Sequence, residues 1–164
     1  MLKKIKTNKL KAVSALLVST ILVTSGCAER SVNIINPQGK VVGECMAGYD
    51  WHFYGLQDSI DYMLYICAKE HIATGHTLSD NSIVTKDYTL PAAPTDKVWS
   101  RALAMSEFKA GRLTEQKLGH LLAQLEWTYV LKQREVEAQL ANNEITPQQA
   151  NALVKAAKAV WQGE

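Results

Sequence analysis

The side chains best suited to chemistry in this chain of 164 residues are a few cysteines and histidines. Cys67 and His71 stand four residues apart, so on a helix they would share one face and could hold a metal ion or form an activated thiol, with His76 close behind. His52 and His120 are scattered, and no phosphate-binding glycine loop, G-x-S-x-G, H-E-x-x-H or C-x-x-C pattern is present. We therefore expect no catalytic residue, no bound metal and no cofactor, and we do not expect an enzyme.

A second group of candidate residues is an aromatic run between two glycines, made of Tyr49, Trp51, Phe53 and Tyr54. Tyrosine and tryptophan dominate the residues that carry binding energy in interfaces, so this run is a candidate binding site for a partner, a sugar or another small ligand. The alternative, which we favour, is that the rings pack on the following helix and fill a small core. Four neighbouring rings cannot all point inward along one strand, which keeps the binding hypothesis open.

The first 27 residues have the pattern of an export signal. A basic segment over residues 1–11 precedes a run of twelve apolar or small residues at 12–23, which is shorter than the roughly 20 residues that span a bilayer. The following Val23-Thr24-Ser25-Gly26-Cys27 resembles the lipobox of bacterial lipoproteins, in which lipid is attached to the cysteine and the chain is cleaved just before it. That family usually has leucine three residues before the cysteine, where this chain has Thr24.

The lipobox resemblance implies a location and an anchor. Residues 1–26 would be a cleaved signal peptide, and acyl chains such as palmitate on Cys27 would hold the protein to a membrane, since each buried CH₂ contributes about 0.8 kcal/mol. Ala28 stands where aspartate is the usual signal for retention in the inner membrane, which implies the periplasmic face of the outer membrane. The alternative is ordinary secretion with cleavage after Ala28.

Removal of the signal peptide also changes the charge of the chain. Five lysines and no acidic residue lie in residues 1–26, so 13 basic and 16 acidic residues remain. A mature chain with a slight negative charge lacks the basic footprint of a nucleic-acid-binding protein. We therefore expect no nucleic-acid partner.

The same resemblance bears on the remaining cysteines. If Cys27 carries lipid, Cys45 and Cys67 are left as an even number in an oxidising compartment, which favours a disulfide between them over the metal or thiol hypotheses. This bond would close a loop of about twenty residues and stabilise the fold by roughly 3 kcal/mol in the chain-entropy model.

The pattern of apolar residues predicts a mainly α protein, with a small disulfide-stapled N-terminal subdomain that has little β structure and a three-helix region after it. The subdomain at 27–90 would contain a hairpin or loop around the turn at Asn36-Pro37-Gln38-Gly39 and a helix over 57–74. We expect that helix to be capped by Asp58 and to stop at Gly75. A strand within 82–90 and a proline-rich linker at 91–96 would follow.

The region at 97–164 has the spacing of three helices. The first would carry Val98 and Trp99 and end near Gly111. The second would run from Thr114 to about residue 141, with Gly119 as a kink or close-packing point. The third would begin with the capping box that Thr146, Pro147 and Gln149 form.

Three functions fit these features. The first is an anchored interaction or accessory protein of the cell envelope with a protein partner, because several large apolar residues of the helical region exceed what a small core can bury; these residues are Trp99, Trp127, Val130, Leu131 and Trp161. The second is a cell-wall or small-ligand binding domain that uses the aromatic run. The third, which we rank last, is an envelope enzyme or metal-binding protein that uses Cys67, His71 and His76.

Overall fold

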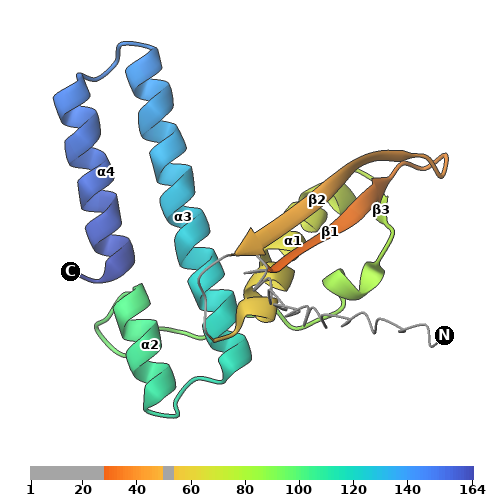
Figure 1. Cartoon of the computed structure of the whole chain (residues 1–164), viewed down its shortest axis with the longest axis horizontal. Helices are drawn as coiled ribbons and strands as arrows, with labels where there is room; N and C mark the ends of the chain where they lie inside the picture. Colours follow the sequence, from red (N-terminus) through yellow and green to blue (C-terminus); the bar gives the residue numbers. More distant parts are fainter. Residues whose placement is uncertain (1–27, 50–53) are drawn as a thin grey trace, which may run out of the picture.

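The computed structural model describes residues 28–49 and 54–164 as a small sheet covered by one helix, followed by three further helices (Figure 1). Cys27, Trp51 and Phe53 lie outside the described residues, as does the whole predicted signal peptide. In the part that is described, none of the helices combines the length and the apolar character needed to cross a membrane. The mainly α composition with a small β component is as predicted.

The N-terminal part is built on an antiparallel hairpin of β1 (Ala28–Ile35) and β2 (Val41–Tyr49). The side chain of Asn36 accepts hydrogen bonds from the backbone N–H groups of Gln38 and Lys40, and Gly39 takes a positive φ of 78° that closes the turn. A two-residue strand, β3 (Thr77–Leu78), pairs with the other edge of β1. Of the hairpin and the loop that the sequence left open, the structure has the hairpin.

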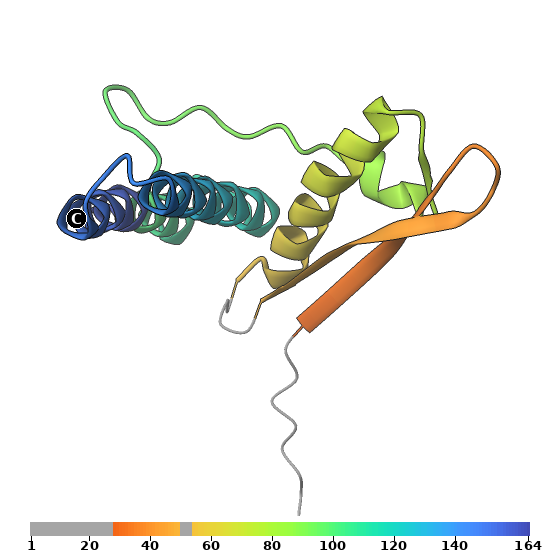
Figure 2. The same ribbon diagram turned by 90° about the horizontal axis from the view of Figure 1, so that it is seen from above.

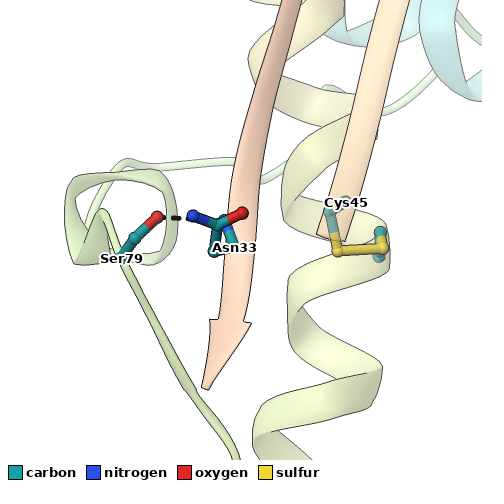
Figure 3. Close-up of a disulfide and its surroundings, with 4 residues drawn as sticks. Asn33, Cys45 and Ser79 are labelled. Atoms are coloured by element: carbon teal, nitrogen blue, oxygen red, sulfur yellow. Dashed lines mark hydrogen bonds between the residues drawn. A yellow bond between two sulfur atoms is a disulfide. The ribbon is translucent and has the colours of Figure 1, made fainter. Parts of the chain in front are cut away.

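Helix α1 (Leu56–Ala73) lies across one face of this sheet, as Figure 2 shows. Alternate side chains of β1 point toward the helix, so Val32 and Ile34 are buried against Ile60 and Leu64. The disulfide between Cys45 and Cys67 is present, with its sulfurs 2.04 Å apart, and joins β2 to α1 (Figure 3). The predicted disulfide is therefore part of this core.

The start of α1 differs from the prediction. The cap is Gly55, with a positive φ of 64° and no side-chain cap, and Asp58 lies in the first turn. The reason lies in a distant contact, since the N–H of Gly55 donates to a carboxylate oxygen of Glu115 at 2.8 Å. At the other end the prediction is confirmed, because Gly75 has a φ of 86° and the N–H of His76 closes back on the carbonyl of His71.

The strand predicted within 82–90 is wrong. The short 3₁₀ helix η1 (Asn81–Val84) stands there, because the side chain of Asp80 accepts from the N–H of Ser82 and turns the chain. This turn points Ile83 into the core beneath α1. Residues 85–100, which include the predicted linker, form no helix or strand and run across to the helical region (Figure 2).

The helical region contains α2 (Arg101–Lys109), α3 (Glu115–Ala141) and α4 (Pro147–Gln162). The predicted caps of the last two are confirmed: the side chain of Thr114 accepts from the N–H of Lys117, and Thr146 and Gln149 form the capping box. Helix α2 begins later than predicted because Ser100 caps it. Val98 and Trp99 therefore precede the helix.

The base of α3 packs on α1 and α2, whereas its outer half contacts α4 in an antiparallel hairpin that projects from the rest of the protein (Figure 1). The six consecutive residues Leu118–Ala123 are all buried at the base. Farther out, the buried residues of the hairpin are Val136 on α3 and Ala150 on α4. The main core therefore ends about one third of the way along α3.

Gly119 marks the point where α3 and α1 touch. The hydroxyl of Ser59 donates to the carbonyl of Gly119 at 2.9 Å. A Cβ atom added at Gly119 would overlap the carbonyl oxygen of Gly55 and lie 2.9 Å from the Cβ of Asp58. Of the two predicted roles, close packing is the one the structure shows, since α3 continues unbroken through this residue.

This contact predicts the effect of a single added methyl group. We expect Gly119→Ala to lower the free energy of unfolding by about 2 kcal/mol, because the two backbones must move apart. Gly43→Ala is the matched control, since its Cβ would meet Ile34 at an ordinary 3.4 Å. Urea denaturation of both variants measures the difference, and equal stability of the two would contradict the close packing of α1 on α3.

Candidate functional site

The first candidate site is the disulfide and its neighbour His71. Cys45, Cys67 and His71 each offer one ligand atom, and these three atoms lie within 4.8 Å of one another. The two sulfurs are joined in the structure, so neither is a thiolate that could act as a nucleophile or ligate a metal. His76 is not part of this group, and its Nδ1 lies 3.0 Å from the hydroxyl of Thr74. In this oxidised form the pair is a cross-link.

The second candidate is the aromatic run, of which Tyr49 and Tyr54 are described. Tyr49 ends β2 and is half-buried, and its burial together with the negative charge of Glu126 raises its pKa above the ordinary value. Tyr54 is exposed and tilts against Phe108 of α2, with ring centroids 5.2 Å apart. The two described rings therefore contact different parts of the protein. Trp51 and Phe53 lie outside the described residues.

A hollow of about 250 Å³ lies beside Tyr49, where β2 approaches α1 and α3. Its walls carry two methionines, a tryptophan and a carboxylate, and the residues concerned are Met46, Ala47, Gly48, Tyr49, Met63, Glu126, Trp127 and Val130. Arg134 lies over the ring of Trp127, with its guanidinium carbon 5.6 Å from the ring centroid. Aromatic and acidic groups in one hollow are compatible with a sugar or another small polar ligand.

The third candidate is a buried histidine that the sequence pattern did not single out. His120 of α3 is 0% exposed, and its ring packs against Tyr62 and Tyr88 with centroids 5.3 and 5.0 Å away. Among the described residues, neither ring nitrogen of His120 nor the hydroxyl of Tyr88 has a hydrogen-bond partner. The sequence offers little signal for this position, because at about 100° per residue His120 lies nearly opposite Leu118 and so falls off the apolar stripe of the helix.

Burial controls the protonation of this histidine. Desolvation lowers the pKa of His120 below its ordinary value, because a charged imidazolium is disfavoured where water is excluded. The effects of nearby charges on this pKa partly cancel. Asp58 and Asp87 raise the pKa, and Lys117 and Lys86 lower it. The ring is therefore neutral in the folded protein near neutral pH.

A separate charged cluster lies between α1 and the sheet. The carboxylate of Asp61 is buried and pairs with Arg30 and Lys86, and Gln57 adds a hydrogen bond of 3.0 Å. Burial alone would raise the pKa of Asp61, but the hydrogen bonds from Lys86 and Gln57 outweigh it and lower the pKa. A carboxylate held ionised by two cations has a structural role and is a poor general acid.

The fourth candidate is a groove between α3 and α4. It measures about 350 Å³, and its lining is almost wholly apolar, with the residues Leu125, Thr128, Tyr129, Lys132, Leu153, Ala156, Ala157, Val160 and Trp161. Tyr129 and Trp161 stack at 5.2 Å with nearly parallel rings. At its rim Val160 is 67% exposed, and Lys132 pairs with Glu135.

The large apolar residues expected on the surface divide between two surroundings. Trp99 packs on the cluster around Leu118, and its indole N–H donates to the carbonyl of Pro91. Trp99 is therefore used inside the fold and is not evidence for a partner-binding surface. Leu131 is 46% exposed on α3, and Trp161 lines the groove. Of the residues expected on the surface, Leu131 and Trp161 thus lie on the projecting hairpin, and other large apolar side chains are exposed on β2 and before α2, at Val41, Val42, Met46 and Val98. Periodicity indicated the apolar face of α4 but not that a groove would remain beside it.

The buried histidine gives a prediction about pH. The pKa of His120 is lowered in the folded protein. Its contribution to the free energy of unfolding is therefore complete above its unfolded pKa of about 6.5 and is lost as the pH falls below that value. We expect the free energy of unfolding to fall by up to about 1.4 kcal/mol per pH unit from this group between pH 6.5 and its folded pKa.

Urea denaturation at pH 7.5, 6.5 and 5.5 measures this dependence. His120→Phe should flatten the curve, whereas His76→Gln should leave it unchanged, because His76 lies at the end of α1 away from this cluster. A wild-type curve that matches that of His120→Phe over this range would contradict the role of the buried ring.

Comparison with protein-family models, with characterised proteins and with solved structures finds no match for this chain. The groove between α3 and α4 is larger than the hollow beside Tyr49 and has exposed apolar side chains at its rim.

Proposed function

We propose that this protein is a lipid-anchored protein of the cell envelope that binds a helical segment of a partner protein in the groove between α3 and α4. The observation that carries the proposal is the groove itself, an apolar hollow of about 350 Å³ on a projecting hairpin. Apolar surface of this kind on a water-soluble domain usually marks a binding site for a partner.

The energetics of the hairpin support a bound partner. Helices in proteins gain most of their stability from the packing of an apolar face. Outside the base of α3, the buried residues of the hairpin are Val136 and Ala150, and Leu153 and Val160 remain exposed beside the groove. A third helix laid along the groove would cover these side chains.

The shape of the groove favours a helix as the occupant. Its lining on α3 runs from Leu125 to Lys132, which is about 10 Å or two turns at 1.5 Å per residue. An amphipathic helix with apolar residues at positions i, i+3, i+4 and i+7 presents a face of this length. The ion pair of Lys132 with Glu135 places both signs of charge at the rim, which suits a helix flanked by mixed charges.

The anchor is supported by the resemblance of residues 23–27 to a lipobox, and the next residue, Ala28, lies in the sheet. Ala28 already belongs to β1 and pairs with Tyr49 of β2. With lipid on Cys27 the end of the sheet would lie close to the membrane surface, on the periplasmic face of the outer membrane. Anchoring raises the local concentration of the groove for other envelope proteins.

The test is site-specific photo-crosslinking in intact cells. A photoreactive residue at Val160 should give one dominant protein adduct, and the same residue at Leu131, exposed on α3 but not part of the groove lining, should not. We expect Leu153→Asp to reduce the adduct at position 160 about tenfold, because a charge in the groove opposes burial. Cys27→Ala, which removes the anchor, should also reduce it.

The outcome that contradicts the proposal is equally specific. Identical adducts from positions 160 and 131 would mean that the groove does not select a partner. Adducts that persist at full yield in both Leu153→Asp and Cys27→Ala would likewise show that neither the groove nor the anchor contributes to binding.

A second candidate function is binding of cell-wall fragments or another small ligand in the hollow beside Tyr49. The specific observation in its favour is the indole of Trp127 in the wall of that hollow next to Glu126. A sugar stacked there should quench the fluorescence of Trp127 during titration with soluble cell-wall fragments, and a Trp127→Leu variant should lack that component. An unchanged spectrum at saturating fragment concentration would exclude this candidate.

A further inference from the structure

Two cysteines and a histidine, which are common metal ligands, lie close together between β2 and α1, and a disulfide between the cysteines prevents them from binding a metal ion. Cys45 lies on β2 and is 1% exposed, whereas Cys67 and His71 lie one turn apart on the same face of α1. The sheet register and the packing of α1 place one ligand atom of each within 4.8 Å of the other two. This set holds a single disulfide in the structure, and His71 has no part in that bond.

We propose that reduction of the Cys45–Cys67 disulfide turns this cross-link into a binding site for Zn²⁺ made of the two thiolates and the imidazole of His71. Thiolate sulfur and imidazole nitrogen are the ligands that zinc prefers in proteins. Three protein ligands leave the fourth tetrahedral position open for water.

The geometry requires a small rearrangement. At a zinc–sulfur distance of about 2.3 Å, tetrahedral angles put two sulfur ligands about 3.8 Å apart. The sulfurs are 2.04 Å apart in the disulfide, so they must separate by less than about 2 Å. Cys67 is only partly buried on the surface of α1, so its side chain has room to turn while Cys45 stays in the core. His71 is already placed on the same helical face.

The chemical step balances with a dithiol as the reductant. One thiolate of the dithiol attacks the sulfur of Cys67, the more accessible of the two, and forms a mixed disulfide while the thiolate of Cys45 leaves. The second thiolate of the dithiol then displaces Cys67 and closes the dithiol into its own disulfide. Two electrons pass to the protein, two protons pass from the dithiol to solvent, and Zn²⁺ binds the two thiolates without changing its oxidation state.

The metal would replace the cross-link that reduction removes. The disulfide joins β2 to α1 within the N-terminal core. A zinc ion bound to residues of both elements would hold the same two segments together, and it would neutralise two thiolates that are otherwise costly in a half-buried place. The sheet and α1 would thus stay linked in either redox state, by the disulfide or by the zinc ion.

The experiment is a zinc titration of the oxidised and the reduced protein. All variants carry Cys27→Ser, so that the thiols measured are those of Cys45 and Cys67, and a phosphine serves as reductant because it adds no competing thiol. Zinc is titrated against a chromophoric chelator, and Co²⁺ is used as a second probe because its bond to sulfur gives a near-ultraviolet charge-transfer band.

We expect one Zn²⁺ per reduced chain, at least tenfold weaker binding by the oxidised chain, and a sulfur–cobalt band in the reduced chain alone. His71→Gln should weaken zinc binding at least tenfold. His76→Gln is the matched control and should bind as the parent does, since His76 is outside the ligand group. Both histidine variants retain the disulfide, so each can be shown to be folded before reduction.

Three results would overturn the proposal: no zinc bound by the reduced chain, equal binding by the oxidised chain, or equal binding by His71→Gln and the parent. The far-ultraviolet circular dichroism spectrum distinguishes loss of fold from loss of the site. A reduced chain that unfolds and regains its spectrum when zinc is added supports the proposal, and one that stays unfolded with zinc present counts against it.

Discussion

The close contact between Gly55 and Gly119 is the constraint on which the rest of the structure depends. It allows the start of α1 to touch the backbone of α3, where the N–H of Gly55 donates to Glu115 and the hydroxyl of Ser59 donates to the carbonyl of Gly119. This joint connects the sheet and its covering helix to the helical region. It also positions His120, one residue farther along α3, against Tyr62 of α1 in a place that excludes water.

Because α3 is held at its base, its outer half projects and packs mainly on α4. The consecutive buried residues of α3 end at Ala123, and an apolar groove remains between the two helices beyond it. The fold therefore separates a well-packed base from a projecting hairpin. In the function we propose, the sheet and α1 would supply a cross-linked base next to the anchor, and the hairpin of α3 and α4 would supply a surface for a partner.

The elements that could be predicted from the sequence are those whose causes are local. The turn at Asn36–Gly39, the stop at Gly75 and the capping box of Thr146 and Gln149 each depend on residues within five positions of one another. The disulfide was also predicted, from the even number of cysteines that would remain if Cys27 carries lipid and from the oxidising compartment that the resemblance to a lipobox implies.

The features that could not be predicted depend on contacts between distant residues. Helix α1 begins at Leu56, after the cap Gly55, and not with Asp58 as its cap, because Glu115, sixty residues away, binds the N–H of Gly55. The expected strand within 82–90 is replaced by η1, whose turn Asp80 and Ser82 form locally but whose direction depends on the packing of Ile83 in the core under α1. The nearness of His71 to both cysteines required the register of β2 on the sheet, and the groove required the packing direction of α4.

The proposed function requires the hairpin to be an incompletely packed element, completed by a partner, on a well-packed base. Hydrogen exchange of the purified protein measures this directly, residue by residue. We predict that amides of Leu118–Ala123 exchange as slowly as global unfolding permits, whereas those of α3 beyond Leu125 and of α4 exchange at least tenfold faster. Equal protection along the whole of α3 and α4 would contradict the proposal, because the hairpin would then be complete without a partner.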